Sequence, residues 1–353
     1  MTGHLVREGA FSADPLVIVD VGARGGVEEF WAVFGQDIKV VAFEPEPEEW
    51  ARLNAGAPSN VTVLPHALGG RAERRKLHVA TLPQASSFYP AREDFNSRFN
   101  FAAQMRVESE IELETTTLAV ALGDLRPDFI KLDAEGAELE ILRGADLGGI
   151  LGLVAEVRFT ELMSGCPTFS ELDLFCREQG FHLYDLDLYR YSRTALPYPF
   201  LYDFRNARGE PAAGATTQGQ ILSGDALYFV DGLTAAKPLK LACLFEVFGL
   251  ADCAAEVILK HGLDRTLLDL LVPPVKGELL TYAEYQRRTL ASDSLFRPTP
   301  GRRFPEATID AYDGKFLPSW QQTRDSQVKQ SSSPCRVGFW DRLRNLFRAG
   351  PAA

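Results

Sequence analysis

The stretch FIKLDAEGAELEILRGA, residues 129–145, places two carboxylates and a lysine at the end of an apolar run. Its first residues, Phe129–Leu132, predict a buried strand, and Asp133 and Glu135 follow that strand. Because ligands of open α/β sheets bind at the carboxyl ends of strands, these two acids and Lys131 are candidates for acid–base chemistry. The simpler alternative is the acidic first turn of the helix that the next apolar residues predict.

A second acidic strand end lies upstream, in LVIVDVGARGG, residues 16–26. Its continuous apolar run is typical of a central strand buried on both faces. Asp20 closes that run, and three glycines follow in a turn whose backbone N–H groups can approach a ligand closely. The next predicted strand, residues 38–43, ends before Glu44, where a carboxylate can accept both hydroxyls of a ribose.

The glycine turn discriminates between two adenosine cofactors. Its pattern, Gly22-Ala-Arg-Gly25-Gly26, does not match the Gly-x-Gly-x-x-Gly spacing of a dinucleotide site. Asp20 would also repel a pyrophosphate, whereas it suits a cationic group such as the amino group of a methionine moiety. The pattern therefore favours S-adenosylmethionine over a nicotinamide cofactor, with a ligand-free turn as the remaining alternative.

Four blocks of the chain resemble, in order and spacing, the FkbM family of S-adenosylmethionine-dependent methyltransferases. They are VDVGARGG, FEPEPEEW, NVTVLPHALGG and TTLAVAL…DFIKLDAEGAELEILRGA, and later segments extend the resemblance over about residues 16–230. The resemblance implies a class I methyltransferase fold and O-methylation of sugars, polyketides or other small hydroxylated compounds. Arg24 departs from the family, which usually carries Asn at this position.

Position in the predicted sheet assigns roles around the cofactor. Asp20 is expected to bind the methionine amino group, and Glu44 the ribose. His66 or Ala67, after the third strand, is expected near the adenine, while the glycine turn would hold the methionine carboxylate. The expected cofactor-binding residues are therefore Asp20, Gly22, Ala23, Gly26, Glu44, His66, Ala67 and Asp133.

Methyl transfer from a sulfonium is an in-line displacement that needs an aligned oxygen nucleophile and gains from removal of its proton. The expected catalytic residues are Asp133, Glu135, Lys131 and Glu156, with Asp133 as the first choice for general base. A pair with Lys131 would weaken Asp133 as a base, so Glu156 is a second candidate. Metal assistance by the three acids stays an alternative, but no His or fixed spacing supports it, and no metal ligand is assigned. Glu138 and Glu140 are expected to be solvated.

Composition excludes some classes of function. The 353 residues carry a formal net charge of −11, which argues against a nucleic-acid substrate because phosphate binding needs clustered Lys and Arg. No signal peptide or transmembrane run is expected. Five scattered cysteines without a Cys-x-x-Cys pair indicate reduced thiols, so we expect a cytoplasmic protein.

Alternation of strands and helices predicts an α/β fold, a Rossmann-like, seven-stranded, doubly wound sheet whose last strand is compatible with an antiparallel direction. The predicted strands are 16–21, 38–43, 61–64, 129–132, 151–157, 182–186 and 226–230, and the helices are 27–34, 47–55, 117–122, 137–142 and 170–179. A long insert, residues 66–116, is expected to add a hairpin of 76–80 with 111–115 and to act as a lid or substrate loop. A tyrosine-rich loop, residues 189–223, is expected either to pack on the sheet edge or to contact a ring of the ligand.

Three regions are expected along the chain: a methyltransferase domain (1–232), a small helical C-terminal region (233–317) and a linker with a terminal helix (318–353). The helical region would contain helices 239–261, 265–271 and 282–290. The last segment, Val337–Arg348, is basic and amphipathic, so it could contact an anionic membrane or a protein groove.

The sequence therefore predicts an S-adenosylmethionine-dependent O-methyltransferase acting on a small-molecule or glycan acceptor. Two rival classes stay open. A nicotinamide-dependent dehydrogenase lacks its glycine pattern here, and a non-catalytic nucleoside-binding or assembly protein would keep the fold without turnover.

Overall fold

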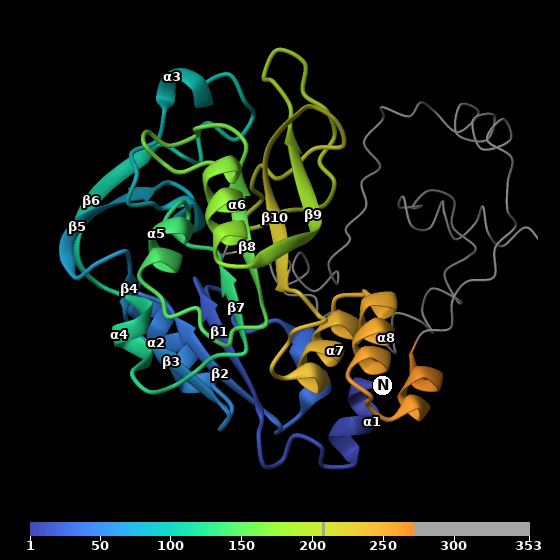
Figure 1. The fold of residues 1–353 in the computed structure, drawn as a ribbon. Coiled ribbons are helices and arrows are strands. Elements are labelled where there is room, and N and C mark those ends of the chain that lie inside the picture. The colour runs from blue at the N-terminus through green and yellow to red at the C-terminus, as the bar shows by residue number, and fades with distance from the viewer. Residues whose placement is uncertain (207–208, 272–353) are drawn as a thin grey trace, which may run out of the picture.

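The computed structural model describes residues 1–206 and 209–271. A seven-stranded sheet with the order β3-β2-β1-β7-β8-β10-β9 forms its centre (Figure 1). All neighbouring strands are parallel except β10, which runs antiparallel to both β8 and β9. The strands are β1 (Leu16–Val21), β2 (Ile38–Phe43), β3 (Val61–Leu64), β7 (Phe129–Leu132), β8 (Gly152–Arg158), β9 (Phe181–Tyr191) and β10 (Gln220–Val230).

All seven predicted strands are confirmed, including the antiparallel direction of the last one. The central strand β1 is buried on both faces, as its apolar run predicts: Leu16, Ile18 and Val19 have no exposed surface. β9 and β10 are longer than predicted because they continue as a twisted pair into the tyrosine-rich loop. The carboxyl ends of β1, β7 and β8 therefore meet at one edge of the sheet, next to the start of β10.

Helices cover both faces of the sheet. One face packs against α4 (Leu118–Leu122), α5 (Glu138–Arg143) and α6 (Phe169–Glu178), and α2 (Pro47–Gly56) packs beside β3. The expected helix 27–34 is a short 3₁₀ helix, η1 (Glu29–Phe34), on the other face. α1 (Thr2–Arg7), which the sequence pattern did not predict, packs beside η1.

The insert forms a second, three-stranded sheet, so the predicted hairpin is confirmed. Its strands are β4 (Ala67–Leu68), β5 (Glu73–Ala80) and β6 (Val107–Thr116), in the order β4-β6-β5. Between β5 and β6 the chain forms the short helices η2 (Pro83–Ala85) and α3 (Glu93–Asn96) and then passes over the edge of the central sheet. The part of the insert between the hairpin strands thus lies where it can line a cavity.

The predicted single helix 239–261 is wrong in one respect, because the structure contains two helices, α7 (Pro238–Val247) and α8 (Ala251–Lys260). Gly249, with a φ of 78°, separates them. A third short helix, η3 (Arg265–Leu270), follows. Phe245 and Phe248 pack in the same core as Trp31, Phe129 and Phe229, so the described part of this region buries its apolar face on the sheet (Figure 1).

Asp128, which has no exposed surface, fixes α7 to the sheet. It accepts hydrogen bonds from the ammonium of Lys240 at 3.0 Å and from the backbone N–H of Val17 at 2.9 Å, and it also pairs with Lys237. The expected helix 282–290, the linker and the terminal segment Val337–Arg348 lie outside the described residues. Among the helices that the structure describes, none is long and apolar enough to cross a membrane.

Candidate functional site

A cavity of about 650 Å³ opens at the carboxyl ends of β1, β7 and β8. Its volume falls within the range of small-molecule sites. The glycine turn and η1 line one side, the acidic ends of β7 and β8 form the floor, and the insert and the tyrosine-rich loop form the opposite wall. The lining includes Gly26, Glu28, Lys131, Asp133, Glu135, Glu156, Arg158 and Asp225.

Lys131 joins the two acidic strand ends. Its ammonium lies 3.2 Å from Asp20 and 3.6 Å from Asp133, and it donates to the carbonyl oxygen of Gly22 at 3.1 Å. Burial raises the pKa of Asp20, while Lys131 acts in the opposite direction. The pair between Lys131 and Asp133 agrees with the sequence-based expectation, whereas the pair between Lys131 and Asp20 was not expected. The charge of Asp20 is therefore already opposed by a lysine of the protein.

The glycine turn packs against the acidic turn with no room for a side chain. Gly22 has a φ of 75°, and a Cβ atom there would lie 1.9 Å from the carbonyl oxygen of Asp133. The backbone N–H groups of Gly22 and Ala23 both donate to the carbonyl oxygen of Phe43. Gly22 thus allows β1 and β7 to end side by side at the site.

The acidic turn after β7 is held in a strained conformation. Glu135 is the one non-glycine residue with positive φ, 51°, in the described chain. The hydroxyl of Ser87, from the insert, donates to its carbonyl oxygen at 2.6 Å. The carboxylate of Glu138 accepts from the backbone N–H groups of Ala134 and Gly136 at 2.8 and 3.1 Å. Strain that the surroundings fix in this way is common at functional sites.

The expectation that Glu138 and Glu140 are solvated is wrong. Glu138 is only 3% exposed because its carboxylate closes the acidic turn. Glu140 accepts hydrogen bonds from Arg75 at 2.8 Å and from the hydroxyl of Tyr89, both from the insert. Glu138 is thus covered by its own turn and by Arg158, and Glu140 by the insert.

Arg158, at the end of β8, binds the acidic side chains that form the floor of the cavity. Its guanidinium is 3% exposed and donates to Glu135 at 2.6 Å and to Glu156 at 2.8 Å; a further nitrogen lies 3.8 Å from Glu138. Burial nevertheless raises the pKa of Glu135 to about 8 and holds the pKa of Glu156 well above its usual range, since one guanidinium does not offset three carboxylates.

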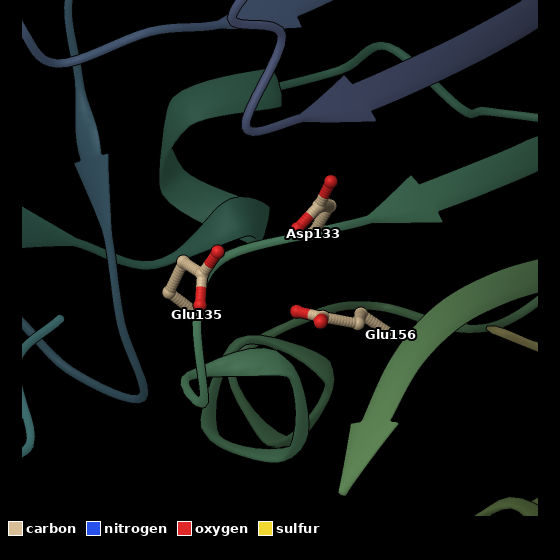
Figure 2. A group of neighbouring side chains, drawn as sticks. All are labelled: Asp133, Glu135 and Glu156. Carbon is tan, nitrogen blue, oxygen red and sulfur yellow. The ribbon is translucent and has the colours of Figure 1, made fainter. Parts of the chain in front are cut away.

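Figure 2 shows the carboxylates of Asp133, Glu135 and Glu156 gathered at the ends of β7 and β8. Each offers an oxygen within 4.8 Å of the other two, a separation that a hard cation could bridge. Arg158 already binds one oxygen each of Glu135 and Glu156, so the protein supplies a positive charge to the cluster.

Acidic residues also lie at the end of β2, where the sequence predicts the ribose of the cofactor. Glu44 is 3% exposed and accepts from the backbone N–H of Glu46 at 2.9 Å, and burial raises its pKa. The guanidinium of Arg24 lies 3.9 Å from Glu44 and 3.6 Å from Glu46. Arg24, the position that departs from the family pattern, therefore covers this end of the cavity.

The structure thus brings Lys131, Asp133, Glu135, Glu156 and Gly26 to the cavity wall. Other expected site residues lie behind that wall or away from it. Asp20, Gly22 and Ala23 lie directly behind the wall, and Glu44 contacts the cavity-lining Arg24. His66 is exposed and Ala67 belongs to β4, and neither lines the cavity.

Glu28, Arg158 and Asp225 are among the lining residues that were not singled out from the sequence as site residues. Glu28 follows the glycine turn, a position that could have drawn attention. Arg158 and Asp225 carry no local signal, because their place depends on the pairing of β8 with β10. Asp225 accepts a hydrogen bond from the hydroxyl of Tyr189 in the tyrosine-rich loop.

The wall opposite the acids is apolar and aromatic. Phe101 and Met105 of the insert lie with Leu162 and Met163 in one cluster, and Tyr191 packs edge-on to Phe101 at 5.0 Å between ring centroids. Both expected acceptor loops therefore line the cavity. An apolar wall facing a charged floor is suited to orienting a small ligand with one polar reacting group.

The strand order with a single reversed strand, together with a glycine turn and acids at the carboxyl ends, defines a class I S-adenosylmethionine-dependent methyltransferase fold. Residues 20–183 match the family model for the methyltransferase FkbM domain. This part of the chain, a little under half of it, is therefore similar to the methyltransferase FkbM domain, and together with the fold it indicates an S-adenosylmethionine-dependent methyltransferase.

The chain is also similar to solved structures, at low sequence identity and low TM-score. The chain is similar to precorrin-6y C5,15-methyltransferase from Geobacter metallireducens (12% identity, 63% of this chain and 86% of that chain, TM-score 0.25). It is also similar to 1,6-didemethyltoxoflavin-N1-methyltransferase from Burkholderia thailandensis (16% identity, 65% and 77%, TM-score 0.26), solved with S-adenosylhomocysteine. No curated protein sequence matches the chain significantly. At these values the fold assignment rests on the strand order of the chain itself.

Proposed function

We propose that this protein transfers a methyl group to a hydroxyl oxygen of a sugar, a glycan or another small hydroxylated metabolite. The observation that carries the proposal is the group of carboxylates of Asp133, Glu135 and Glu156, which line one cavity beside the glycine turn. A hydroxyl nucleophile gains from a nearby proton acceptor, and carboxylates can both orient it and take its proton.

The residues at the cavity fit the cofactor. Gly26 of the glycine turn lines the cavity, and Glu44, which follows β2, lies 3.9 Å from the cavity-lining Arg24, so we expect Glu44 to bind the ribose. The cofactor supplies an electrophilic methyl group on a positively charged sulfonium. The excess of carboxylates over cations at the floor favours a positive charge there.

The carboxylates divide the work of the reaction. Asp133, the first choice for general base from the sequence, lies 3.6 Å from Lys131, so we assign it to orienting the acceptor hydroxyl. Glu135, whose pKa burial raises to about 8, is better matched to accepting a proton near neutral pH. Arg158 holds Glu135 and Glu156 in place through the guanidinium that they share.

Calorimetric titration of the purified protein with S-adenosylmethionine and S-adenosylhomocysteine tests the first half of this proposal, with NAD and NADP as controls. Transfer of a labelled methyl group to panels of hydroxylated compounds tests the second half. Glu135→Gln should abolish most labelled product while the affinity for S-adenosylhomocysteine stays unchanged, whereas Glu161→Gln, on an exposed carboxylate, should change neither. Labelling of amines only would contradict O-methylation. Equal amounts of labelled product from Glu135→Gln and the wild-type protein would contradict the role of Glu135 as proton acceptor.

A further inference from the structure

Six carboxylates line the cavity within the described chain, and five of them have a partner supplied by the protein. Lys131 pairs with Asp133, and Arg158 pairs with Glu135 and Glu156. Arg52 binds Glu49 at 2.6 Å, and the hydroxyl of Tyr189 donates to Asp225. Glu28 is the sixth, and within residues 1–206 and 209–271 its side chain makes no hydrogen bond or ion pair.

Glu28 stands at the N-cap position of η1 but does not cap it. Its backbone is extended (φ −65°, ψ 137°), and its carboxylate accepts no hydrogen bond from the first turn of the helix. An acidic side chain at this position usually caps the helix, so its orientation toward the cavity is a departure that the helix does not explain. Glu28 follows the glycine turn in the sequence, and its side chain lines the same cavity as Lys131.

We propose that Glu28, rather than Asp20, binds the α-ammonium group of S-adenosylmethionine. The proposal rests on the cofactor use on which the proposed function also depends. Asp20 was the candidate from sequence position, but it lies behind the cavity wall and its charge is opposed by Lys131 at 3.2 Å. Glu28 lines the cavity itself and has a carboxylate without a partner.

The electrostatic surroundings of Glu28 favour a cation over any other ligand group. The negative charges of Asp20, Asp133 and Asp225 raise the pKa of Glu28, and the positive charge of Lys131 lowers it. Burial and these acids raise the pKa of Glu28 to about 8. A carboxylate group of a ligand would be repelled at this position, whereas an ammonium would supply the missing charge and three N–H donors.

The two termini of the amino-acid moiety can therefore be told apart by the site. Glu28 would accept from the ammonium and would repel the carboxylate, whereas the N–H groups of Gly22 and Ala23 already donate to Phe43 and that of Gly26 donates to Ala23. Binding then requires Glu28 to be ionised, so at neutral pH the cofactor would displace a proton from it.

The experiment compares two adenosine ligands by calorimetry on the full chain: S-adenosylhomocysteine and 5′-methylthioadenosine, which lacks the amino-acid moiety. Glu28→Gln should weaken S-adenosylhomocysteine by about tenfold or more, the value of one buried charged hydrogen bond, and leave 5′-methylthioadenosine unchanged. Glu29→Gln, on the neighbouring residue that does not line the cavity, is the matched control and should change neither.

A second measurement needs no variant. Titration of the wild-type protein in two buffers of different ionisation enthalpy near neutral pH should show release of close to one proton with S-adenosylhomocysteine and much less with 5′-methylthioadenosine. Unchanged binding by Glu28→Gln, equal weakening of both ligands, or absence of proton release would overturn the assignment of Glu28 alone. Failure of the wild-type protein to bind S-adenosylhomocysteine would instead remove the cofactor use and, with it, the proposed function.

Discussion

Gly22→Ala should disconnect the glycine turn from the acidic turn, and Gly25→Ala offers a matched control. Both glycines have positive φ, 75° and 93°, so either substitution brings a conformational cost of about 1–2 kcal/mol. A Cβ atom at Gly25 would meet nothing within 4 Å, whereas one at Gly22 would lie 1.9 Å from the carbonyl oxygen of Asp133. That atom belongs to the backbone, so β1 and β7 must separate, and overpacking of this kind costs about 1–3 kcal/mol more.

Urea unfolding at equilibrium measures this difference, and we expect Gly22→Ala to be destabilised by about 2–5 kcal/mol and Gly25→Ala by about 1–2 kcal/mol. Calorimetry on the folded variants should show a larger loss of S-adenosylhomocysteine affinity for Gly22→Ala, because the displaced carbonyl belongs to Asp133, whose carboxylate pairs with Lys131. Equal destabilisation of the two variants would refute the argument that the close contact with Asp133, rather than φ alone, requires glycine at position 22.

Three further substitutions test the charged groups. Burial holds the pKa of Glu156 well above 4.5, so the folded protein binds this proton more tightly than the unfolded chain, and the stability that this proton contributes is lost as pH rises above that value. Glu156→Gln should therefore raise the free energy of unfolding at about pH 9 and leave it unchanged at about pH 5. Arg158→Met should cost about 3–5 kcal/mol by leaving buried carboxylates unpaired, whereas Arg177→Met, at an exposed ion pair, should stay within about 1 kcal/mol, both by urea unfolding. Asp128→Ala should cost about 3–5 kcal/mol in the same assay, because it leaves the ammonium of Lys240, which is 5% exposed, without this carboxylate. An unchanged free energy of unfolding would contradict the role given to this pair.

The sheet could be predicted from the sequence because its strands carry strong local signals. The structure contains β1 at its continuous apolar run, and the predicted acids lie at the ends of β1, β2 and β7. Basic residues of one hairpin strand face acids of the other, and in the structure Lys76 and Glu110 form an ion pair across the hairpin at 2.8 Å. These features depend on residues that are neighbours in sequence or in one hairpin.

Other features depend on contacts that no local pattern encodes. Helical periodicity in residues 239–261 gave one helix, because a single glycine inside an apolar pattern does not by itself predict a break; the positive φ of Gly249 follows from packing on Trp31 and Phe129. Glu138 was expected in solvent because its partner, Arg158, comes from a different strand. For the same reason, Arg158 was not predicted as a site residue.

The distribution of cations explains how the site tolerates its acids. Lys131 lies between Asp20 and Asp133, and Arg158 lies between Glu135 and Glu156, so each cation serves one pair of carboxylates, and burial still raises the pKa of Asp20, Glu135 and Glu156. Replacing such an arrangement by apolar residues would be neutral or stabilising for the fold alone, so stability does not account for it. A ligand with its own positive charge does, because it favours the ionised form of these carboxylates on binding. Asp133, Glu135 and Glu156 line the cavity itself, so we expect the charge of the ligand, more than its shape, to be the property that this floor selects.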